Sequence, residues 1–182
     1  MGRSSLIAHF ELGQPDWAME ALAQLPEYLP DIQARMALVI RFSRLNIEFG
    51  TGGPFAAGVF ETLSGRLVTI GVNRVVHHQC SSAHAEVMAL SLAQQTLASF
   101  DLGAQGMAEH QLVVNWRPCA MCYGALVWSG VRSLVVVGGG GVGARDGRMT
   151  RMRVGRRRMM TTRMTRVAAG GVGDWTVCVV VV

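Results

Sequence analysis

Apolar side chains recur at helical spacing in the first part of the chain. A short stretch of this kind covers residues 16–24. A longer one begins after Asp31, which follows Pro30 and is a suitable N-cap residue, and apolar residues then recur every three or four positions until Gly50. The pattern therefore predicts a short helix followed by a longer one of about four turns.

Strands and helices alternate in the pattern that follows Gly50. Two runs rich in β-branched and aromatic residues are joined through Ser64-Gly65, which favours a β-hairpin. Segments of helical composition separate the later strands, and such helical crossovers would make the last two strands parallel. The sequence predicts an α/β domain with strands at 57–62, 66–72, 111–116 and 133–137, and with helices at 83–99 and 119–129.

Length and composition restrict the class of protein. A chain of 182 residues is long enough for one sizeable domain and too short for two ordinary ones. Since 50% of the residues are apolar and 16% are charged, extensive disorder is not expected. No apolar run reaches the roughly 18 residues of a membrane span, and the first residues lack the pattern of a secretory signal. We expect a soluble, cytoplasmic protein without membrane association.

The positive charge of the chain is confined to its C-terminal part. The net charge is +5, but residues 1–137 carry a net charge of −2 and residues 138–182 a net charge of +7. Nucleic acid is therefore not an expected partner of the body of the chain. The tail uses only nine residue types and contains ten Gly and nine Arg, so it is a low-complexity segment.

The Met-Thr-Arg repetition in this tail suggests a genetic origin. ATG, ACG and AGG codons read in another frame give GAT, GAC and GAG, which would encode an acidic run. We hypothesise that the tail is frameshifted or otherwise aberrant, and the alternative is a genuine basic tail exposed to solvent. The chain would then consist of an N-terminal extension (1–30), one domain (31–137) and the tail (138–182).

Three residues could hold a soft or borderline metal ion. Cys119 and Cys122 are three positions apart, so on a helix both thiols project from one face. Pro118 suits a helix start, where the helix dipole favours thiolates. His84 has the matching position at the start of the other predicted helix. One imidazole and two thiolates leave one position of a tetrahedral zinc for water, and that arrangement is typical of catalytic zinc.

Glu86 follows His84 by two positions and could reach that water without being a ligand. Zinc lowers the pKa of a bound water to about 7, and a neighbouring carboxylate can accept its proton and return it to a leaving group. Taken alone, Cys-x-x-Cys is also typical of a redox pair, and His-x-Glu of an ordinary helix surface. A closed structural zinc is a further alternative, with its fourth ligand from His77, His78 or Cys80.

Together, the His-x-Glu and Pro-Cys-x-x-Cys segments form the signature of zinc nucleobase deaminases. Over roughly residues 31–137 the chain resembles the cytidine deaminase-like superfamily, and within it the bacterial guanine deaminases. The metal motif is specific for the superfamily but not for the base. The segments that carry the resemblance are Gly53-Pro54-Phe55-Ala56-Ala57, Gly71-Val72-Asn73-Arg74, His84-Ala85-Glu86, Pro118-Cys119-Ala120-Met121-Cys122 and Trp128-Ser129-Gly130-Val131.

The resemblance implies a three-layer αβα sandwich around a mixed five-stranded sheet in the order 2-1-3-4-5. It implies that one Zn²⁺ per chain is bound by His84, Cys119 and Cys122, that Glu86 shuttles protons, and that the protein is a homodimer. It also implies a purine-binding pocket. The substrate contacts that it carries over are Asn73, Phe55 and Ala85.

Two of these contacts have simpler explanations, and the sequence departs from the family in two places. Asn73 could be a turn residue after a strand, and Phe55 could belong to the core.

Arg117 stands where the family usually has Glu before Pro-Cys. Nothing in the tail matches the Phe-Asp-Glu-Gly-type segment and terminal helix that give guanine deaminases a second acidic contact. The fifth strand is therefore open, because the valine-rich residues 176–182 could pair with the sheet or promote aggregation.

The activity implied by the resemblance is hydrolytic deamination of a purine base, with guanine converted to xanthine and ammonia. Within the same chemistry, the alternative is a tRNA adenosine deaminase, but the acidic body gives little support to phosphate binding. A zinc-bound scaffold of the deaminase fold, without turnover because the acidic segment is missing, is an alternative from another class. RNA binding by the Arg-rich tail is a further one.

Overall fold

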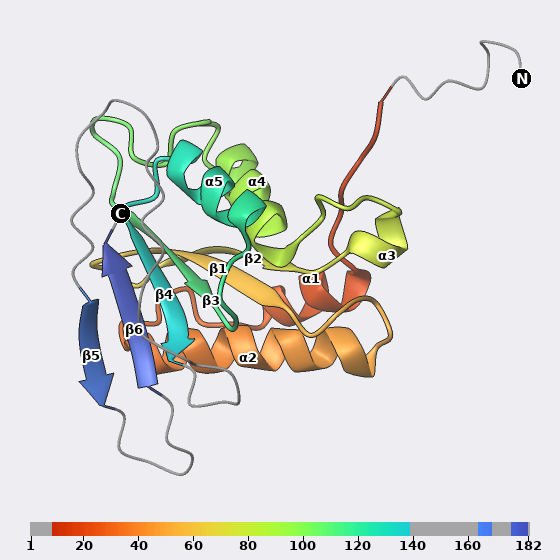
Figure 1. Ribbon diagram of the computed structural model, residues 1–182, viewed down its shortest axis with the longest axis horizontal. Coiled ribbons are helices and arrows are strands. Elements are labelled where there is room, and N and C mark those ends of the chain that lie inside the picture. The colour runs from red at the N-terminus through yellow and green to blue at the C-terminus, as the bar shows by residue number, and fades with distance from the viewer. Residues whose placement is uncertain (1–8, 139–163, 169–175, 182) are drawn as a thin grey trace, which may run out of the picture.

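The computed structural model describes residues 9–138, 164–168 and 176–181 (Figure 1). The predicted helices and strands are present close to their expected bounds, and a short helix that the sequence pattern did not predict follows the second strand. The elements are α1 (Asp16–Ala23), α2 (Ile32–Glu48), β1 (Ala56–Glu61), β2 (Leu67–Val72), α3 (Val75–His78), α4 (Ala85–Thr96), β3 (His110–Val114), α5 (Ala120–Trp128), β4 (Ser133–Gly138), β5 (Met164–Ala168) and β6 (Thr176–Val181).

The strands form one mixed sheet in the order β2-β1-β3-β4-β6-β5. β1 lies between β2 and β3 and is antiparallel to both, whereas β3 and β4 are parallel. The predicted hairpin, the parallel pair and the order 2-1-3-4 are confirmed. The fifth place in the sheet is taken by the backbone of β6, which is antiparallel to β4, and β5 adds a sixth strand beyond the five that the resemblance implies.

Helices cover both faces of this sheet, so the three-layer αβα sandwich is confirmed (Figure 1). α4 and α5 lie next to each other on one face, and α1 and α2 lie on the other. Neighbouring residues of β3 serve opposite faces, as the two-residue period of a strand requires. Leu112 packs in the apolar cluster with Ala89 and Leu126, whereas Val113 packs in the cluster with Phe42.

A close contact between β2 and α4 fixes how near the helix lies to the sheet. A Cβ atom at Gly71 would lie 2.3 Å from the backbone nitrogen of Ala89 and 2.5 Å from the carbonyl oxygen of Ala85. Glycine is therefore required here, since no side chain fits between strand and helix. The backbone N–H of Arg74 also donates to the carbonyl oxygen of Ala83 (2.9 Å), which ties the segment after β2 to the start of α4.

The described part of the N-terminal segment packs against the domain. Ala18 of α1 is 1% exposed and belongs to the same apolar cluster as α2. Nearer to α2, the N–H of Leu29 donates to the carbonyl oxygen of Gly65, and the N–H of Leu67 donates to that of Glu27, both at 2.8 Å. The bond of Leu67 covers the start of the outer edge of β2, which would otherwise be free there to pair with another chain.

Most of the tail lies outside the described residues. The frameshift hypothesis and the division into residues 1–30, 31–137 and 138–182 therefore stay predictions. Within the described part of the chain, no helix is both long enough and apolar enough to cross a membrane.

Candidate metal centre and its surroundings

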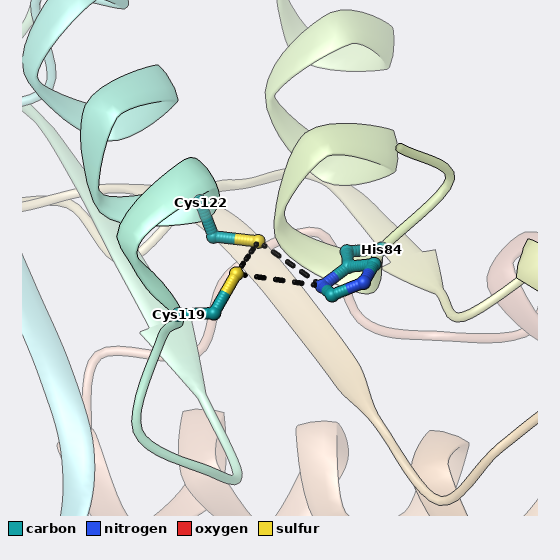
Figure 2. Close-up of side chains that lie close together, drawn as sticks. All are labelled: His84, Cys119 and Cys122. Carbon is teal, nitrogen blue, oxygen red and sulfur yellow. Dashed lines mark hydrogen bonds between the residues drawn. The ribbon is translucent and has the colours of Figure 1, made fainter. Parts of the chain in front are cut away.

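Two helix starts bring the three predicted metal ligands together (Figure 2). His84 is the N-cap residue of α4 and Cys119 that of α5, and Cys122 follows in the first turn of α5. The His84 Nδ1 atom lies 3.4 Å from the Cys122 Sγ atom and 3.7 Å from the Cys119 Sγ atom. The two sulfur atoms are 3.5 Å apart. All three atoms converge on one point between the helices.

These separations fit a tetrahedral zinc ion. With bonds of about 2.3 Å to sulfur and about 2.0 Å to nitrogen, tetrahedral geometry places two sulfur ligands about 3.8 Å apart and a sulfur and a nitrogen ligand about 3.5 Å apart. The three observed distances, 3.4, 3.5 and 3.7 Å, are close to these values. Two thiolates and an imidazole are also the donors that zinc prefers.

His77, His78 and Cys80, the alternative fourth ligands of a closed zinc site, do not join this group. Within the described residues, the cluster of possible metal ligands consists of His84, Cys119 and Cys122. His78 instead contacts the backbone of Gly13, whose N–H lies 3.2 Å from the His78 Nε2 atom. Cys80 lies on a loop with its Sγ atom 3.2 Å from the Ser82 hydroxyl. The group therefore has three protein ligands, and Cys119 is exposed on its outer side.

Glu86 is two residues after His84, and its proton-transfer role stays a prediction. It belongs to the first turn of α4 and is half-buried. Burial raises the pKa of the Cys122 thiol, and the neighbouring Glu86 carboxylate raises it further. The negative charge of Glu86 therefore lies near enough to Cys122 to disfavour its thiolate form. Because a thiol must lose its proton to bind zinc, metal binding at Cys122 releases a proton next to this carboxylate.

Backbone hydrogen bonds connect the segments that carry the three predicted substrate contacts with the start of α4, where His84 lies. The N–H of Asn73 donates to the carbonyl oxygen of Phe55 (3.0 Å). The next residue, Arg74, is bonded to Ala83 just before His84. Phe55 is 38% exposed, so it is not a core residue. The remaining contact, Ala85, is 1% exposed at the first position of α4.

Asn73 also fits its simpler explanation as a turn residue. It follows β2 directly and its Oδ1 atom accepts a hydrogen bond from the backbone N–H of Val75 at 3.4 Å. This bond is long, and the side chain is 9% exposed, so the amide is largely buried but not saturated with partners. A turn role and a substrate contact are therefore compatible.

Comparison with protein families decides what kind of site this is. The family model described as the cytidine and deoxycytidylate deaminase zinc-binding region matches residues 32–138. The chain belongs to this family. His84, Cys119 and Cys122 are accordingly the ligand group of a zinc-binding region.

Two curated relatives are similar over the same length of chain. Guanine deaminase of Bacillus subtilis (strain 168) is 32% identical over 83 residues, which are 46% of this chain and 49% of that protein. The tRNA-specific adenosine deaminase of Buchnera aphidicola subsp. Schizaphis graminum is 30% identical over 83 residues, which are 46% of this chain and 52% of that protein. The chain thus spans about half the length of the curated relatives it matches.

Solved structures extend the similarity. The guanine deaminase from Nitrosomonas europaea is 46% identical and has a TM-score of 0.67, covering 72% of this chain and 71% of that chain. A structure of NE0047 in complex with 2,6-diaminopurine is 49% identical with a TM-score of 0.66, covering 69% of this chain and 66% of that chain. Mutants of NE0047 have been solved with 8-azaguanine. These relatives therefore bind purine ligands.

Sequence reasoning missed the side chains that hold the loop of residues 50–56, whose last residue, Ala56, is also the first residue of β1. The Asn115 Oδ1 atom accepts from the N–H of Ala56 and its Nδ2 atom donates to the carbonyl oxygen of Pro54, both at 2.9 Å. Asn46, in the last turns of α2, bonds to the same loop. The only available signal was the position of Asn115 just before the metal motif. Arg117, the departure from the family pattern, is exposed.

Proposed function

We propose that the protein is a zinc-dependent hydrolase that deaminates a purine base, converting guanine to xanthine and ammonia. The observation that carries the proposal is the spacing of the His84, Cys119 and Cys122 donor atoms, which fits three ligands of a tetrahedral zinc ion. Glu86 lies in the first turn of the helix that His84 caps. Similarity to solved guanine deaminases at 46% and 49% identity supports the choice of base.

Three side chains would hold the zinc ion, and a fourth would move protons. When bound, zinc polarises water so that it ionises near neutral pH. The Glu86 carboxylate would accept one proton from the attacking water and pass it to the purine ring nitrogen. It would then take the second water proton from the new hydroxyl group and deliver it to the departing amine. The new bond joins the water oxygen to the carbon that carries the amine. The carbon–nitrogen bond then breaks, and ammonia leaves.

The remaining residues would bind and orient the base. Asn73 offers both an amide donor and a carbonyl acceptor, which suits the polar edge of guanine. The half-exposed ring of Phe55 can pack against the flat face of a base. Ala85 is the first residue of α4, and its backbone N–H is one of those at a helix start that lack an acceptor within the helix. It can therefore donate to the substrate.

A tRNA adenosine deaminase remains the second candidate, because the Buchnera enzyme of that name is similar over the same number of residues. The net charge of −2 over residues 1–137 favours an uncharged free base over a polyphosphate substrate. The cytoplasmic location and the homodimer expected from the sequence belong to the same proposal. So does the division of the chain at residues 30 and 137.

The test is a substrate panel on zinc-loaded protein whose coding frame has been verified by resequencing. We expect ammonia release from guanine and none from an adenosine-containing anticodon stem-loop, cytosine or cytidine. Glu86→Gln keeps the size of the side chain and should lower kcat by about 10² to 10⁴-fold while zinc content stays at one ion per chain. Full activity in this variant would contradict the mechanism.

The scaffold alternative predicts a different set of results from the same preparation. Zinc would bind at one ion per chain and guanine would raise the melting temperature, but no substrate of the panel would release ammonia. Product from the stem-loop alone would instead favour the tRNA enzyme. Deletion of residues 138–182, followed by RNA binding at several salt concentrations, separates any contribution of the basic tail from that of the site.

A further inference from the structure

Asn46 is a buried polar residue that the proposed reaction does not use. It lies near the end of α2 and is 0% exposed. Its Nδ2 atom donates to the carbonyl oxygen of Gly53 (2.8 Å) and to that of Asn73 (3.0 Å). One amide group therefore joins the loop of residues 50–56 to the proposed substrate contact after β2.

The other end of the Asn46 amide is fixed by a second hydrogen bond. The Thr51 hydroxyl donates to the Asn46 Oδ1 atom at 2.8 Å. In the opposite amide orientation, the Oδ1 atom would face two carbonyl oxygens, and both interactions would be repulsive. The bond from Thr51 thus selects the orientation in which Asn46 donates to Gly53 and Asn73.

Thr51 is itself fixed from the N-terminal helix. The Trp17 indole N–H of α1 donates to the Thr51 hydroxyl oxygen at 2.9 Å, which leaves the hydroxyl proton for Asn46. The Trp17 ring stacks on Phe49 with centroids 5.3 Å apart and planes at 10°. Trp17, Thr51 and Asn46 form a continuous series of hydrogen bonds, which we call the Trp17 relay.

The surroundings of the relay leave little room for the loop to move. A Cβ atom at Gly52 would lie 1.9 Å from the carbonyl oxygen of Asn73 and 2.7 Å from the Asn46 Nδ2 atom. From the other side, the Arg74 guanidinium donates to the carbonyl oxygen of Thr51 at 2.8 Å. The backbone around Asn73 and the loop that precedes Phe55 are therefore locked against each other.

We infer that the Trp17 relay is a positioning device for purine recognition, through which α1 fixes the backbone that carries Asn73 and Phe55. The inference rests on the proposed function, because it assigns these two residues to the substrate. Trp17, Thr51 and Asn46 act through other residues and have no contact with the base. Loss of the relay should therefore weaken substrate binding more than it slows the chemical step.

Two conservative variants remove single hydrogen bonds from the relay. Thr51→Val keeps the shape of the side chain and removes the hydroxyl, whereas Trp17→Phe keeps an aromatic ring against Phe49 and removes the indole N–H. Trp128→Phe is the matched control, because Trp128 is 86% exposed at the end of α5. In the zinc-loaded full chain, we expect Thr51→Val to raise KM for guanine about ten-fold with little change in kcat. Trp17→Phe should raise KM less.

A second measurement does not depend on turnover. The amide hydrogens of Thr51 and Asn73 are bonded to the carbonyl oxygens of Asn46 and Phe55, each at 3.0 Å. Hydrogen exchange at these two amides should be faster in Thr51→Val than in the wild type, with unchanged zinc content. Thr51→Ser, which restores the hydroxyl, should return both KM and exchange toward wild-type values.

The two measurements separate failure of the inference from failure of the proposed function. An unchanged KM together with unchanged exchange in Thr51→Val would overturn the relay. A fall in kcat without a rise in KM would also overturn it, since positioning of the base would then not be its role. Absence of guanine deamination in the wild type would refute the proposed function. In that case faster exchange at Asn73 in Thr51→Val, but not in Trp128→Phe, would still support the structural part of the inference.

Discussion

The metal centre and the loop of residues 50–56 are neighbours built from different kinds of interaction. The metal ligands come from two helix starts, where His84 and Cys119 are N-cap residues and Cys122 lies three residues after Cys119. Within each helix, the position of a ligand is determined by its distance of a few residues from the helix start. Sequence spacing does not show, however, that α4 and α5 lie next to each other on the sheet.

The loop, in contrast, is held by side chains that are distant in sequence. Asn115 bonds to Ala56 and Pro54 from 59 and 61 positions away. Arg74 reaches the carbonyl oxygen of Thr51 from 23 positions away, and Trp17 reaches the Thr51 hydroxyl from 34. The chemistry of the site is thus set by local motifs, and the proposed recognition of the base by a long-range polar network. We expect substitutions in the loop to change KM mainly and substitutions in the metal centre to change zinc content.

The largest effect is expected at the metal centre. Cys122→Ser removes the buried thiol and should lower zinc affinity and deaminase activity at least about a hundred-fold, since even partners of metal ligands commonly contribute ten- to a hundred-fold. Cys80→Ser is the matched control, because Cys80 lies outside the ligand group. Zinc content by atomic absorption and ammonia release would be measured for both. Equal losses in the two variants would contradict the assignment of ligands.

The metal centre could be predicted from the sequence because its signals are local. Pro118 before Cys-x-x-Cys marks a helix start, and the spacing of Cys119 and Cys122 places both sulfurs on one side of that helix. Glu86 two residues after His84 follows the same logic on α4. The juxtaposition of the two motifs needed the resemblance to a family in addition, since spacing alone left a redox pair and a closed zinc site open.

Most of the fold could also be predicted from local signals, because its helices and strands have regular hydrophobic periods. The exceptions are a very short helix and the pairing of the last strand. Helix and strand periods located α2, α4 and the first four strands. The four-residue helix α3 was missed because a segment of this length has no period to detect, and its end depends on Gln79 in a left-handed conformation (φ 49°). The composition of residues 176–182 indicated a strand but not its neighbour in the sheet.

The structure of the loop could not be predicted, because the residues that hold it lie far apart in the sequence and follow no regular spacing. Asn46 reads in the sequence as one more polar residue of α2, and nothing near it indicates contact with Asn73. Gly52 appears in the sequence as part of a Gly-rich turn, although glycine is required there because of the carbonyl oxygen of Asn73, a residue 21 positions later in the chain. Only the folded chain brings these groups together.

An intermediate effect is expected at Gly52, where a substitution should affect the loop and leave the metal centre intact. Gly52→Ala forces a Cβ atom against the Asn73 carbonyl oxygen and should lower the free energy of unfolding by about 1–3 kcal/mol. KM for guanine should rise while zinc content is retained. Gly124→Ala is the matched control within α5, where the added Cβ atom has no neighbour within 4 Å apart from the adjacent residues and the backbone of the helix itself. Since alanine favours helix over glycine, that variant should gain roughly 0.5–1 kcal/mol. Loss of zinc in Gly52→Ala would show that the two regions are not independent.

The smallest effect is expected at an ion pair remote from both regions. β1 begins beside the loop and ends at Glu61, whose carboxylate lies 2.7 Å from the Arg66 guanidinium. Hydrogen bonds from the Ser64 hydroxyl and from Arg66 lower the pKa of Glu61 below its ordinary value of 4.5. The charged form is therefore favoured by folding. Its contribution to stability is present at neutral pH and is lost as the pH falls below 4.5 through the lowered value.

Arg66→Met tests this expectation with urea unfolding at neutral and at acidic pH. The pair lies at the surface and is partly covered, with side chains 34% (Arg66) and 18% (Glu61) exposed. The variant should be less stable by about 0.2–1 kcal/mol at pH 7, and the difference should shrink once Glu61 is protonated. Zinc release at acidic pH affects wild type and variant alike, because ligand protonation does not depend on Arg66. The difference between the two chains is therefore the informative quantity. A change in KM or zinc content in Arg66→Met would mean that the far end of β1 is coupled to the site, and the separation into two independent regions would then have to be abandoned.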